Sequence, residues 1–319
     1  MKTLVIFLII WQASCASTEA QNPSDTELIN PPDMEQTLWN KSYRDIFSDA
    51  LDLKRPKTEN KGPFPISVVK DQWFTLGPSD QIAADMFIPE QYGPSPLVII
   101  VHGNRFSKEM HQSQAEYMAS WGIHVMTLNL PNEKEWLLNG FRTKKMVSML
   151  SAVPTIMSAN IDTSKIILVG HSFGGSAVTI SAAQGANVAG LVLLDPAVVS
   201  EEIYNYQKSI RVPVVLLGAD ATVFQSRHRS TFSKNIKSPF FEVSIAGAEH
   251  TDAQQPLAHP LYEWFVQSKP RSKRRSIFTQ LILESTISIL ENNFSYLSET
   301  IRETSKNSKI DVKIEHWTR

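Results

Sequence analysis

The chain has 319 residues, of which 42% are hydrophobic and 20% charged, and its formal net charge at pH 7 is −1. This composition is that of a globular protein, and the length suits one large domain. The near-zero charge argues against a nucleic-acid partner. The only dense basic cluster, residues 271–275, is predicted to be a solvated loop, with contact to anionic lipid as the alternative.

The N-terminus has the pattern of a signal peptide, predicted over residues 1–16. Its apolar run, Thr3–Trp11, follows a positive residue and is too short to span a bilayer. Two processing routes are open. Cleavage after Ala16 would release a soluble chain, whereas Ala13-Ser14-Cys15 resembles the end of a bacterial lipoprotein box, which would make Cys15 a lipidated membrane anchor. Either route predicts an exported protein, periplasmic or extracellular in the first case and membrane-anchored in the second.

Cys15 is the only cysteine of the chain. The mature protein therefore has no internal disulfide, and its folded domain has neither a cysteine nucleophile nor a thiolate zinc site. We expect no metal and no organic cofactor.

A polar linker is predicted over 17–62, with one short helix around Gln36–Leu51, and a domain over 63–303 follows it. In this domain, strand and helix patterns alternate. The predicted strands are Ile66–Leu76, Gln81–Pro89, Leu97–Val101, His124–Leu130, Lys165–Val169, Gly190–Leu194, Val212–Leu217 and Phe240–Ile245. The predicted helices are Gln112–Trp121, Lys144–Ala159, Gly174–Gln184 and a final one over Ser276–Glu303.

The first two strands, joined by a short Gly-Pro-Ser-Asp turn, are predicted to form an antiparallel hairpin. The others alternate with helices and imply parallel pairing through right-handed crossovers. The fold class is therefore α/β, with a mostly parallel eight-stranded sheet flanked by helices. Residues 304–319 are predicted to be a loose polar tail.

The most informative motif is Gly170-His171-Ser172-Phe173-Gly174, which lies between a buried strand and a helix of small residues. In this context, Gly-x-Ser-x-Gly is the sharp turn that exposes a nucleophilic serine at the end of a sheet. We therefore expect Ser172 to be a nucleophile. His171 is expected to point away from the Ser172 hydroxyl.

A serine hydroxyl needs a base to take its proton and an acid to orient that base. His250, on the loop after the last predicted parallel strand, is the expected base. Two acids follow strands and precede this histidine: Asp195 stands directly at a strand end and is favoured, and Asp220 after the next strand is the alternative. Asp252 is too close to His250 in sequence and is expected to order the loop.

Acyl transfer also needs donors for the developing oxyanion. The backbone N–H groups of Asn104, after the strand that ends in His102-Gly103, and of Phe173 are the expected donors. His102 lacks companions for metal binding and is expected to order its loop.

From Ile66 to Phe294 the chain resembles the α/β-hydrolase superfamily. The resemblance is carried by His102-Gly103, the Ser172 motif, Leu194-Asp195-Pro196 and Glu249-His250. Within the superfamily it is similar to the branch of platelet-activating-factor acetylhydrolases, chlorophyllases and dienelactone-hydrolase-like esterases. In the first two groups the acid maps onto Asp195. A related polyester-hydrolase branch takes its acid one strand later, where Asp220 is displaced by one place.

The resemblance implies a site without a large lid domain, because only residues 196–211 separate Asp195 from the next strand. Trp136, Val198, Val199 and Phe224 fall in loops at the carboxyl ends of strands and are candidates for the substrate pocket. The predicted function is that of an exported serine carboxylesterase that acts on a small-molecule or lipid ester. The alternatives are an acyltransferase that uses the same acyl-enzyme, and a non-catalytic envelope or binding protein.

Overall fold

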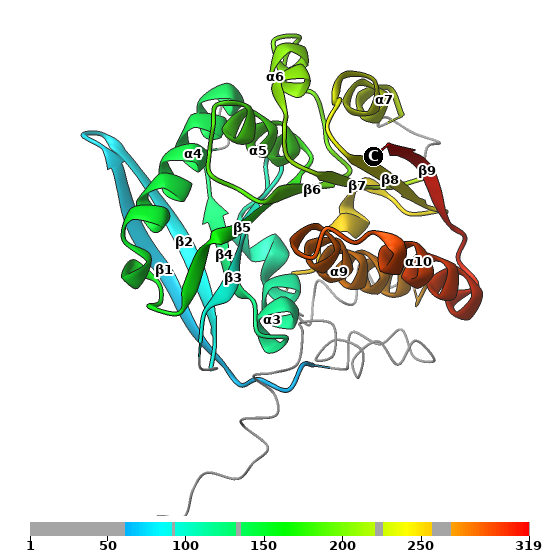
Figure 1. Ribbon diagram of the computed structural model, residues 1–319, viewed down its shortest axis with the longest axis horizontal. Helices are drawn as coiled ribbons and strands as arrows, with labels where there is room; N and C mark the ends of the chain where they lie inside the picture. The colour runs from blue at the N-terminus through cyan, green and yellow to red at the C-terminus, as the bar shows by residue number, and fades with distance from the viewer. Residues whose placement is uncertain (1–60, 91–92, 132–134, 221–225, 257–268, 319) are drawn as a thin grey trace, which may run out of the picture. The chain divides into compact units, whose positions relative to one another are not determined.

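The computed structural model describes residues 61–90, 93–131, 135–220, 226–256 and 269–318. Within these ranges one sheet runs through the molecule in the order β1-β2-β4-β3-β5-β6-β7-β8-β9 (Figure 1). The six strands from β4 to β8 are parallel, and antiparallel strands flank them: the β1–β2 hairpin at one end and β9 at the other.

The strand bounds agree with the predicted ones to within a few residues. The strands are β1 Ile66–Gly77, β2 Asp80–Pro89, β3 Ser95–Val101, β4 His124–Asn129, β5 Ile161–His171, β6 Gly190–Leu194, β7 Val214–Gly218, β8 Phe240–Ile245 and β9 Val312–Thr318. The described α-helices are α3 Gln112–Ser120, α4 Trp136–Ala152, α5 Phe173–Ala183, α6 Ile203–Ser209, α7 Ser226–Asn235, α9 Lys269–Leu290 and α10 Ser295–Ser308. Short 3₁₀ turns are η1 Lys108–His111, η2 Pro154–Ile156 and η3 His250–Ala253.

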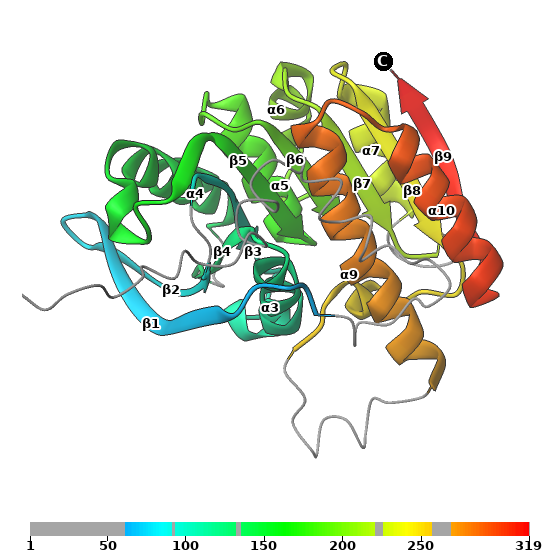
Figure 2. The same cartoon turned by 60° about the horizontal axis from the view of Figure 1, so that its bottom comes forward.

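Side chains of the central strands alternate between two cores, as the period of two along a strand requires. Val98 and Ile100 of β3 face a core that contains residues of α3, α9 and α10. Leu97, Ile99 and Val101 face the opposite core, with residues of α4, α5 and α7. The sheet is thus covered by helices on both faces (Figure 1 and Figure 2). This burial explains why the parallel strands are continuous apolar runs in the sequence.

The end of the chain differs from the predicted loose tail. Residues 312–318 form β9, which pairs antiparallel with β8 and makes the described sheet nine-stranded instead of eight-stranded. Only Val312 of this strand is buried, and the other side chains are exposed. The polar composition of residues 304–319 therefore gave a wrong prediction, because an edge strand pairs through its backbone while most of its side chains face water.

The predicted final helix is two helices, α9 and α10. They are interrupted where Asn292 adopts a left-handed φ of 50°. Asparagine tolerates this conformation, and the Asn293 carboxamide then accepts a hydrogen bond from Ser295 N at 3.1 Å (N···O). An Asn-Asn pair inside an apolar stripe is thus a helix boundary, which the period of the stripe concealed.

Helix α4 begins eight residues before its predicted start at Lys144 and ends earlier than predicted, at Ala152. The early end has a local cause: Val153 precedes Pro154 and has a non-helical backbone, with φ and ψ of −138° and 72°. Helix α6 was not predicted, since it is short and polar, whereas α7 contains His228, for which a polar helical stretch was expected.

Several predictions lie outside the described residues. They are the signal peptide 1–16 with Cys15, the linker up to residue 60 with its helix at 36–51, and Phe224. Among the described residues, every helix is too short or too polar to cross a bilayer.

Candidate functional site

Ser172 occupies a strained turn between β5 and α5. Its φ and ψ are 55° and −122°, a conformation that L-residues rarely adopt. The neighbouring glycines make the turn possible: a Cβ at Gly170 would lie 2.4 Å from the Gly174 carbonyl oxygen, and a Cβ at Gly174 would lie 2.4 Å from Val101 O. The Gly-x-Ser-x-Gly pattern is therefore a steric requirement of this turn, which holds the start of α5 against the end of β3.

Asp195 follows β6, the strand next to β5. Ser172 N donates to Leu194 O at 3.0 Å, and Ala197 N donates to Ser172 O at 2.9 Å. These bonds fix the Asp195 segment beside Ser172. The Asp195 side chain is fully buried, and the backbone of Asp195, like that of Ser172, has a positive φ, here 40°. Two adjacent strands thus end in strained non-glycine residues at the same edge of the sheet.

The structure brings His250 to Asp195. His250 Nδ1 lies 2.6 Å from Asp195 Oδ2, and Ala219 N donates to the other carboxylate oxygen, Oδ1, at 3.1 Å. A carboxylate only accepts hydrogen bonds, so the Nδ1 proton points at Asp195 and Nε2 carries the lone pair of the neutral ring. The His250 side chain is 28% exposed, so solvent reaches the ring that carries this nitrogen.

No hydrogen bond joins the Ser172 hydroxyl to the His250 ring among the described residues. Such a bond is often long in a site without ligand and shortens when substrate binds.

Asp220, the alternative acid, has another role in this geometry. Its carboxylate accepts a hydrogen bond from Gly247 N at 2.7 Å, and its own N–H donates to Ala248 O at 3.0 Å. These contacts order the turn that leads to His250. Within the described contacts, the His250 ring meets Asp195 and not Asp220.

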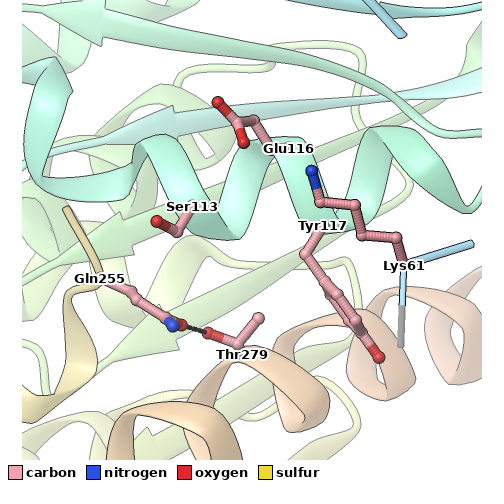
Figure 3. Close-up of a pocket in the computed structure, with 6 residues that line it drawn as sticks. All are labelled: Lys61, Ser113, Glu116, Tyr117, Gln255 and Thr279. Atoms are coloured by element: carbon pink, nitrogen blue, oxygen red, sulfur yellow. Dashed lines mark hydrogen bonds between the residues drawn. The ribbon is translucent and has the colours of Figure 1, made fainter. Parts of the chain in front are cut away.

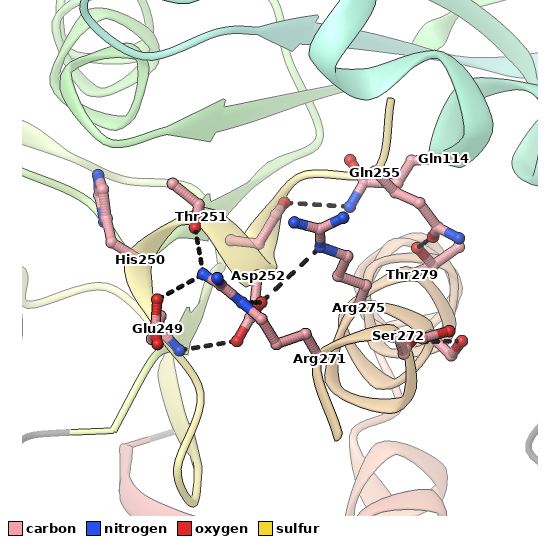
Figure 4. A network of polar contacts seen from close by, with 12 residues as sticks. Gln114, Glu249, His250, Thr251, Asp252, Gln255, Arg271, Ser272, Arg275 and Thr279 are labelled. Atoms are coloured by element: carbon pink, nitrogen blue, oxygen red, sulfur yellow. Dashed lines mark hydrogen bonds and ion pairs between the residues drawn. The ribbon is translucent and has the colours of Figure 1, made fainter. Parts of the chain in front are cut away.

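The η3 turn that begins with His250 is attached to α9 by arginine side chains (Figure 4). Arg271 donates to Glu249, to Thr251 Oγ1 at 3.1 Å and to Asp252 Oδ1 at 3.4 Å. Arg275 lies 3.7 Å from the same Asp252 oxygen. Asp252 is fully buried and also accepts from Glu249 N, which completes a reciprocal cap of the turn.

The basic cluster 271–275 is therefore not the solvated loop that was predicted. It forms part of α9, and Arg275 is buried. Lys273 donates to Ser308 O, and Arg274 donates to Ala246 O at 3.2 Å. The charges hold neighbouring segments together, because carboxylates and carbonyl groups of those segments face α9.

His102 orders the loop that contains Asn104. Its Nε2 accepts from Leu130 N at 3.0 Å, so the proton is on Nδ1, which donates to Gly103 O at 2.8 Å. Burial lowers the pKa of His102, which keeps the ring neutral. The described residues contain no group of three or more His, Cys, Asp or Glu side chains that could hold a metal ion.

Trp136 lies between the two residues predicted to donate to the oxyanion. It is buried as the first residue of α4, and not in a loop as predicted. Its Nε1–H donates to Asn104 Oδ1 at 3.4 Å. Its ring packs edge-on against Phe173 and His102, with centroid distances of 5.8 and 5.9 Å. One indole therefore contacts the segments of both Asn104 and Phe173.

Comparison with known proteins agrees with this architecture. The model of the alpha/beta hydrolase family matches residues 98–293, more than half of the chain. The chain belongs to the alpha/beta hydrolase family. No curated protein matches it.

The alpha/beta hydrolase fold of this chain has only a small segment between β6 and β7. This segment contains α6 and the half-buried Val198 and Val199, which contact the core on the α4 and α5 side. Val198 N donates to His228 Nδ1 of α7 at 3.0 Å, which fixes the segment over that face. No lid domain is inserted here.

A pocket of about 180 Å³ lies away from Ser172 in this hydrolase, between α3, α9 and the segment after η3 (Figure 3). It is lined by Lys61, Ser113, Glu116, Tyr117, Gln255 and Thr279. Burial raises the pKa of Tyr117 to about 12, so its hydroxyl remains protonated. None of the predicted site residues lines this pocket.

Sequence analysis missed the polar side chains that surround His250. Gln254, Gln114 and His111 are buried close to η3, and none of them belongs to a motif. The only signal available was the spacing of Gln254, four residues after the predicted base, and spacing alone does not distinguish a contact from an exposed loop residue.

Proposed function

We propose that this member of the alpha/beta hydrolase family is a serine ester hydrolase. Family membership supports a hydrolase function, and the finer assignment rests on one observation. That observation is the 2.6 Å hydrogen bond between His250 Nδ1 and Asp195 Oδ2, close to Ser172, whose backbone has a φ of 55°. A serine with positive φ, an oriented neutral histidine and a buried carboxylate are the parts that acyl transfer requires.

In the proposed reaction, Ser172 Oγ attacks the ester carbonyl carbon while His250 Nε2 takes the hydroxyl proton. Asp195 stabilises the imidazolium that results, because its carboxylate already accepts the Nδ1 proton. The carbonyl oxygen becomes an oxyanion, which accepts hydrogen bonds from the backbone N–H groups of Asn104 and Phe173. The imidazolium then protonates the leaving alcohol as the C–O bond breaks, and water releases the acyl group by the reverse sequence.

The proposed substrate is a small-molecule or lipid ester. The short segment between β6 and β7 supports a site that admits a bulky ester, and the partly buried Phe173 and Val198 offer apolar contacts beside it. The buried Trp136 packs against Phe173. This assignment is consistent with the resemblance to the platelet-activating-factor acetylhydrolase and chlorophyllase branch, which remains part of the proposal.

The test is hydrolysis of p-nitrophenyl esters from acetate to palmitate by wild type, Ser172→Ala, Asp195→Asn and Asp220→Asn. We expect Ser172→Ala to lose activity by about 10⁶-fold and Asp195→Asn by about 10⁴-fold. Asp220→Asn retains most of the activity, because an amide oxygen still accepts the Gly247 N–H. Loss in Asp220→Asn with retention in Asp195→Asn would contradict the assignment of the acid.

The same assay separates the alternatives. An acyltransferase would give mainly the new ester when an alcohol is added, as product analysis shows. A binding protein would give equal, background turnover for wild type and Ser172→Ala, and this outcome would overturn the proposed function.

We further propose that the protein is exported. The support is the apolar run Thr3–Trp11 with the small residues that follow it. Intact mass and N-terminal sequencing of the secreted form distinguish cleavage after Ala16 from a lipidated N-terminal Cys15. An unprocessed Met1 in the cell fraction would contradict both routes.

A further inference from the structure

His171 is a buried side chain next to Ser172 that the proposed reaction does not use. It is the last residue of β5 and is fully buried. Its ring lies against that of His250, with a centroid distance of 4.5 Å and an interplanar angle of 35°. His171 Nε2 lies 3.1 Å from the backbone carbonyl oxygen of His250. Both the ring and the backbone of His250 therefore contact this residue.

The contacts of the His171 ring with Gln254 and with the His250 carbonyl identify the nitrogen that carries the proton. Gln254 Nε2 lies 3.0 Å from His171 Nδ1. An amide NH₂ group only donates, so Nδ1 is the acceptor and the proton of the neutral ring is on Nε2. In this tautomer, Nε2–H donates to His250 O. In the other tautomer, two lone pairs would face each other at that contact.

A second buried pair holds the other end of the same turn. His111 Nδ1 donates to Gln114 Oε1 at 2.6 Å, which leaves the amide group of Gln114 to donate to Ala253 O at 3.1 Å. The carbonyl groups at both ends of η3 thus accept hydrogen bonds from buried side chains. On the opposite side, the turn is attached to α9 by Arg271 and Arg275.

His171 is neutral, which suits a residue that supports the His250 ring, because the His250 ring becomes cationic in the proposed reaction. Burial, and then the neighbouring His250, His111 and His102, hold the pKa of His171 well below its usual range. A neutral His171 does not oppose the proton that His250 acquires in the proposed reaction, whereas a cation at this distance would.

We propose that His171 is a positioning residue for His250 and that Gln254 holds the His171 ring in the place that makes this possible. The inference rests on the proposed function. A core histidine whose hydrogen bonds only satisfy burial is the simpler interpretation, and it predicts that loss of the Gln254 donor affects folding stability and leaves turnover alone.

The test is Gln254→Met, which has nearly the same size but no donor and lies outside the Ser172 turn. The matched control is Gln207→Met. Gln207 is also fully buried, but its amide group contacts Thr231 and Asn235 of α7 instead of the site. We expect kcat on p-nitrophenyl butyrate to fall about 30-fold or more in Gln254→Met with KM little changed, because misplacement by about 1 Å costs on the order of 10²-fold. Gln207→Met keeps its kcat at a similar melting temperature.

Long-range ¹H–¹⁵N spectra report the tautomer directly. The wild-type His171 ring is expected to be protonated at Nε2 and to show the Nδ1 shift of a nitrogen that accepts a hydrogen bond. In Gln254→Met, that Nδ1 shift is expected to change, because the donor to Nδ1 is gone. His171→Gln, whose amide group places a donor near the position of Nε2, is expected to retain at least tenfold more kcat than His171→Phe.

The outcomes separate the two proposals. Equal kcat in Gln254→Met and Gln207→Met, or equal kcat in His171→Gln and His171→Phe, overturns the positioning proposal while Ser172-dependent turnover of wild type upholds the proposed function. If wild type has no Ser172-dependent turnover, the proposed function fails and the positioning proposal fails with it.

Discussion

At the scale of single residues, Trp136 joins two segments that are distant in sequence. Its indole donates to the Asn104 side chain and packs against Phe173. The backbone N–H groups of these two residues are the proposed oxyanion donors, and their separation decides whether both reach one oxygen atom. Such donors act only if they are held in place before the charge develops.

Replacement of Trp136 by phenylalanine tests this role. Trp136→Phe keeps an aromatic ring but removes the Nε1–H donor, so Asn104 loses one contact that fixes its loop. We expect kcat for p-nitrophenyl acetate to fall about 5- to 10-fold, in line with the roughly 1 kcal/mol of a single hydrogen bond. Trp121→Phe, on the other core near α3, is the control for loss of a buried indole. Equal kcat values in the two variants would show that the Asn104 contact is irrelevant.

The principal candidate residues could be predicted because their chemistry depends on local patterns. Ser172 lies in a motif whose glycines are sterically necessary, Asp195 directly follows an apolar strand, and His250 lies in the loop after the last parallel strand. Gln254 could not be predicted, and Trp136 was expected only as a loop residue of the substrate pocket, because their contacts depend on which segments meet in three dimensions. A glutamine and a tryptophan in predicted loops carry no local signal of those contacts.

At the scale of elements, the one-turn η3 depends on α9 for its place. Arg271 contacts Glu249, Thr251 and Asp252, which surround His250 in sequence. The Arg271 side chain is 27% exposed and Glu249 is exposed, so their ion pair adds little to the overall stability. The buried Asp252 keeps Arg275 and Glu249 N as partners when Arg271 is removed. The effect of Arg271 should instead be local, on the orientation of the turn.

Arg271→Ala should therefore separate activity from stability. We expect the free energy of unfolding to fall by about 1 kcal/mol or less, while kcat falls about 5- to 10-fold. Arg302→Ala removes a comparable arginine on α10, which pairs with Glu299 and Glu303, and leaves kcat unchanged. Urea unfolding and steady-state kinetics provide the two readouts. A large loss of stability with unaltered kcat would assign Arg271 to the fold instead of the site.

Among the elements, the parallel strands were predictable because they are buried on both faces and appear as apolar runs. Strand β9 is exposed apart from Val312, so its order depends on pairing with β8 and on the hydrogen bonds between Val312 and Ser305 of α10, which no local pattern reveals. The same limit applies to the boundary between α9 and α10, where one left-handed asparagine ends a helix whose apolar stripe continues.

At the scale of the whole molecule, buried neutral histidines make stability depend on pH. Burial lowers the pKa of His111 and of His124 to about 4. The unfolded chain binds protons at these rings near pH 6.5, whereas the folded chain does not. The stability that these two neutral rings contribute is therefore fully present above pH 6.5 and is lost as the pH falls from about 6.5 to about 4.

We expect each of the two rings to contribute about 3 kcal/mol to the loss of unfolding free energy at pH 4. Urea denaturation at pH 7 and pH 4.5 measures the loss. His124→Asn, which removes one titrating group away from the site, should show a smaller difference between the two pH values. An identical difference in wild type and variant would mean that His124 is not the source.

The arrangement of the site along the sheet has a kinetic consequence. Asn104, Ser172, Asp195 and His250 follow β3, β5, β6 and β8, and β7 lies between the last two, so the site exists only when five strands are paired in register. Parallel pairing closes long loops and is slow, whereas helices form early. During refolding, helical circular dichroism should recover before turnover does, and a chain trapped with one strand unpaired would look largely folded yet be inert.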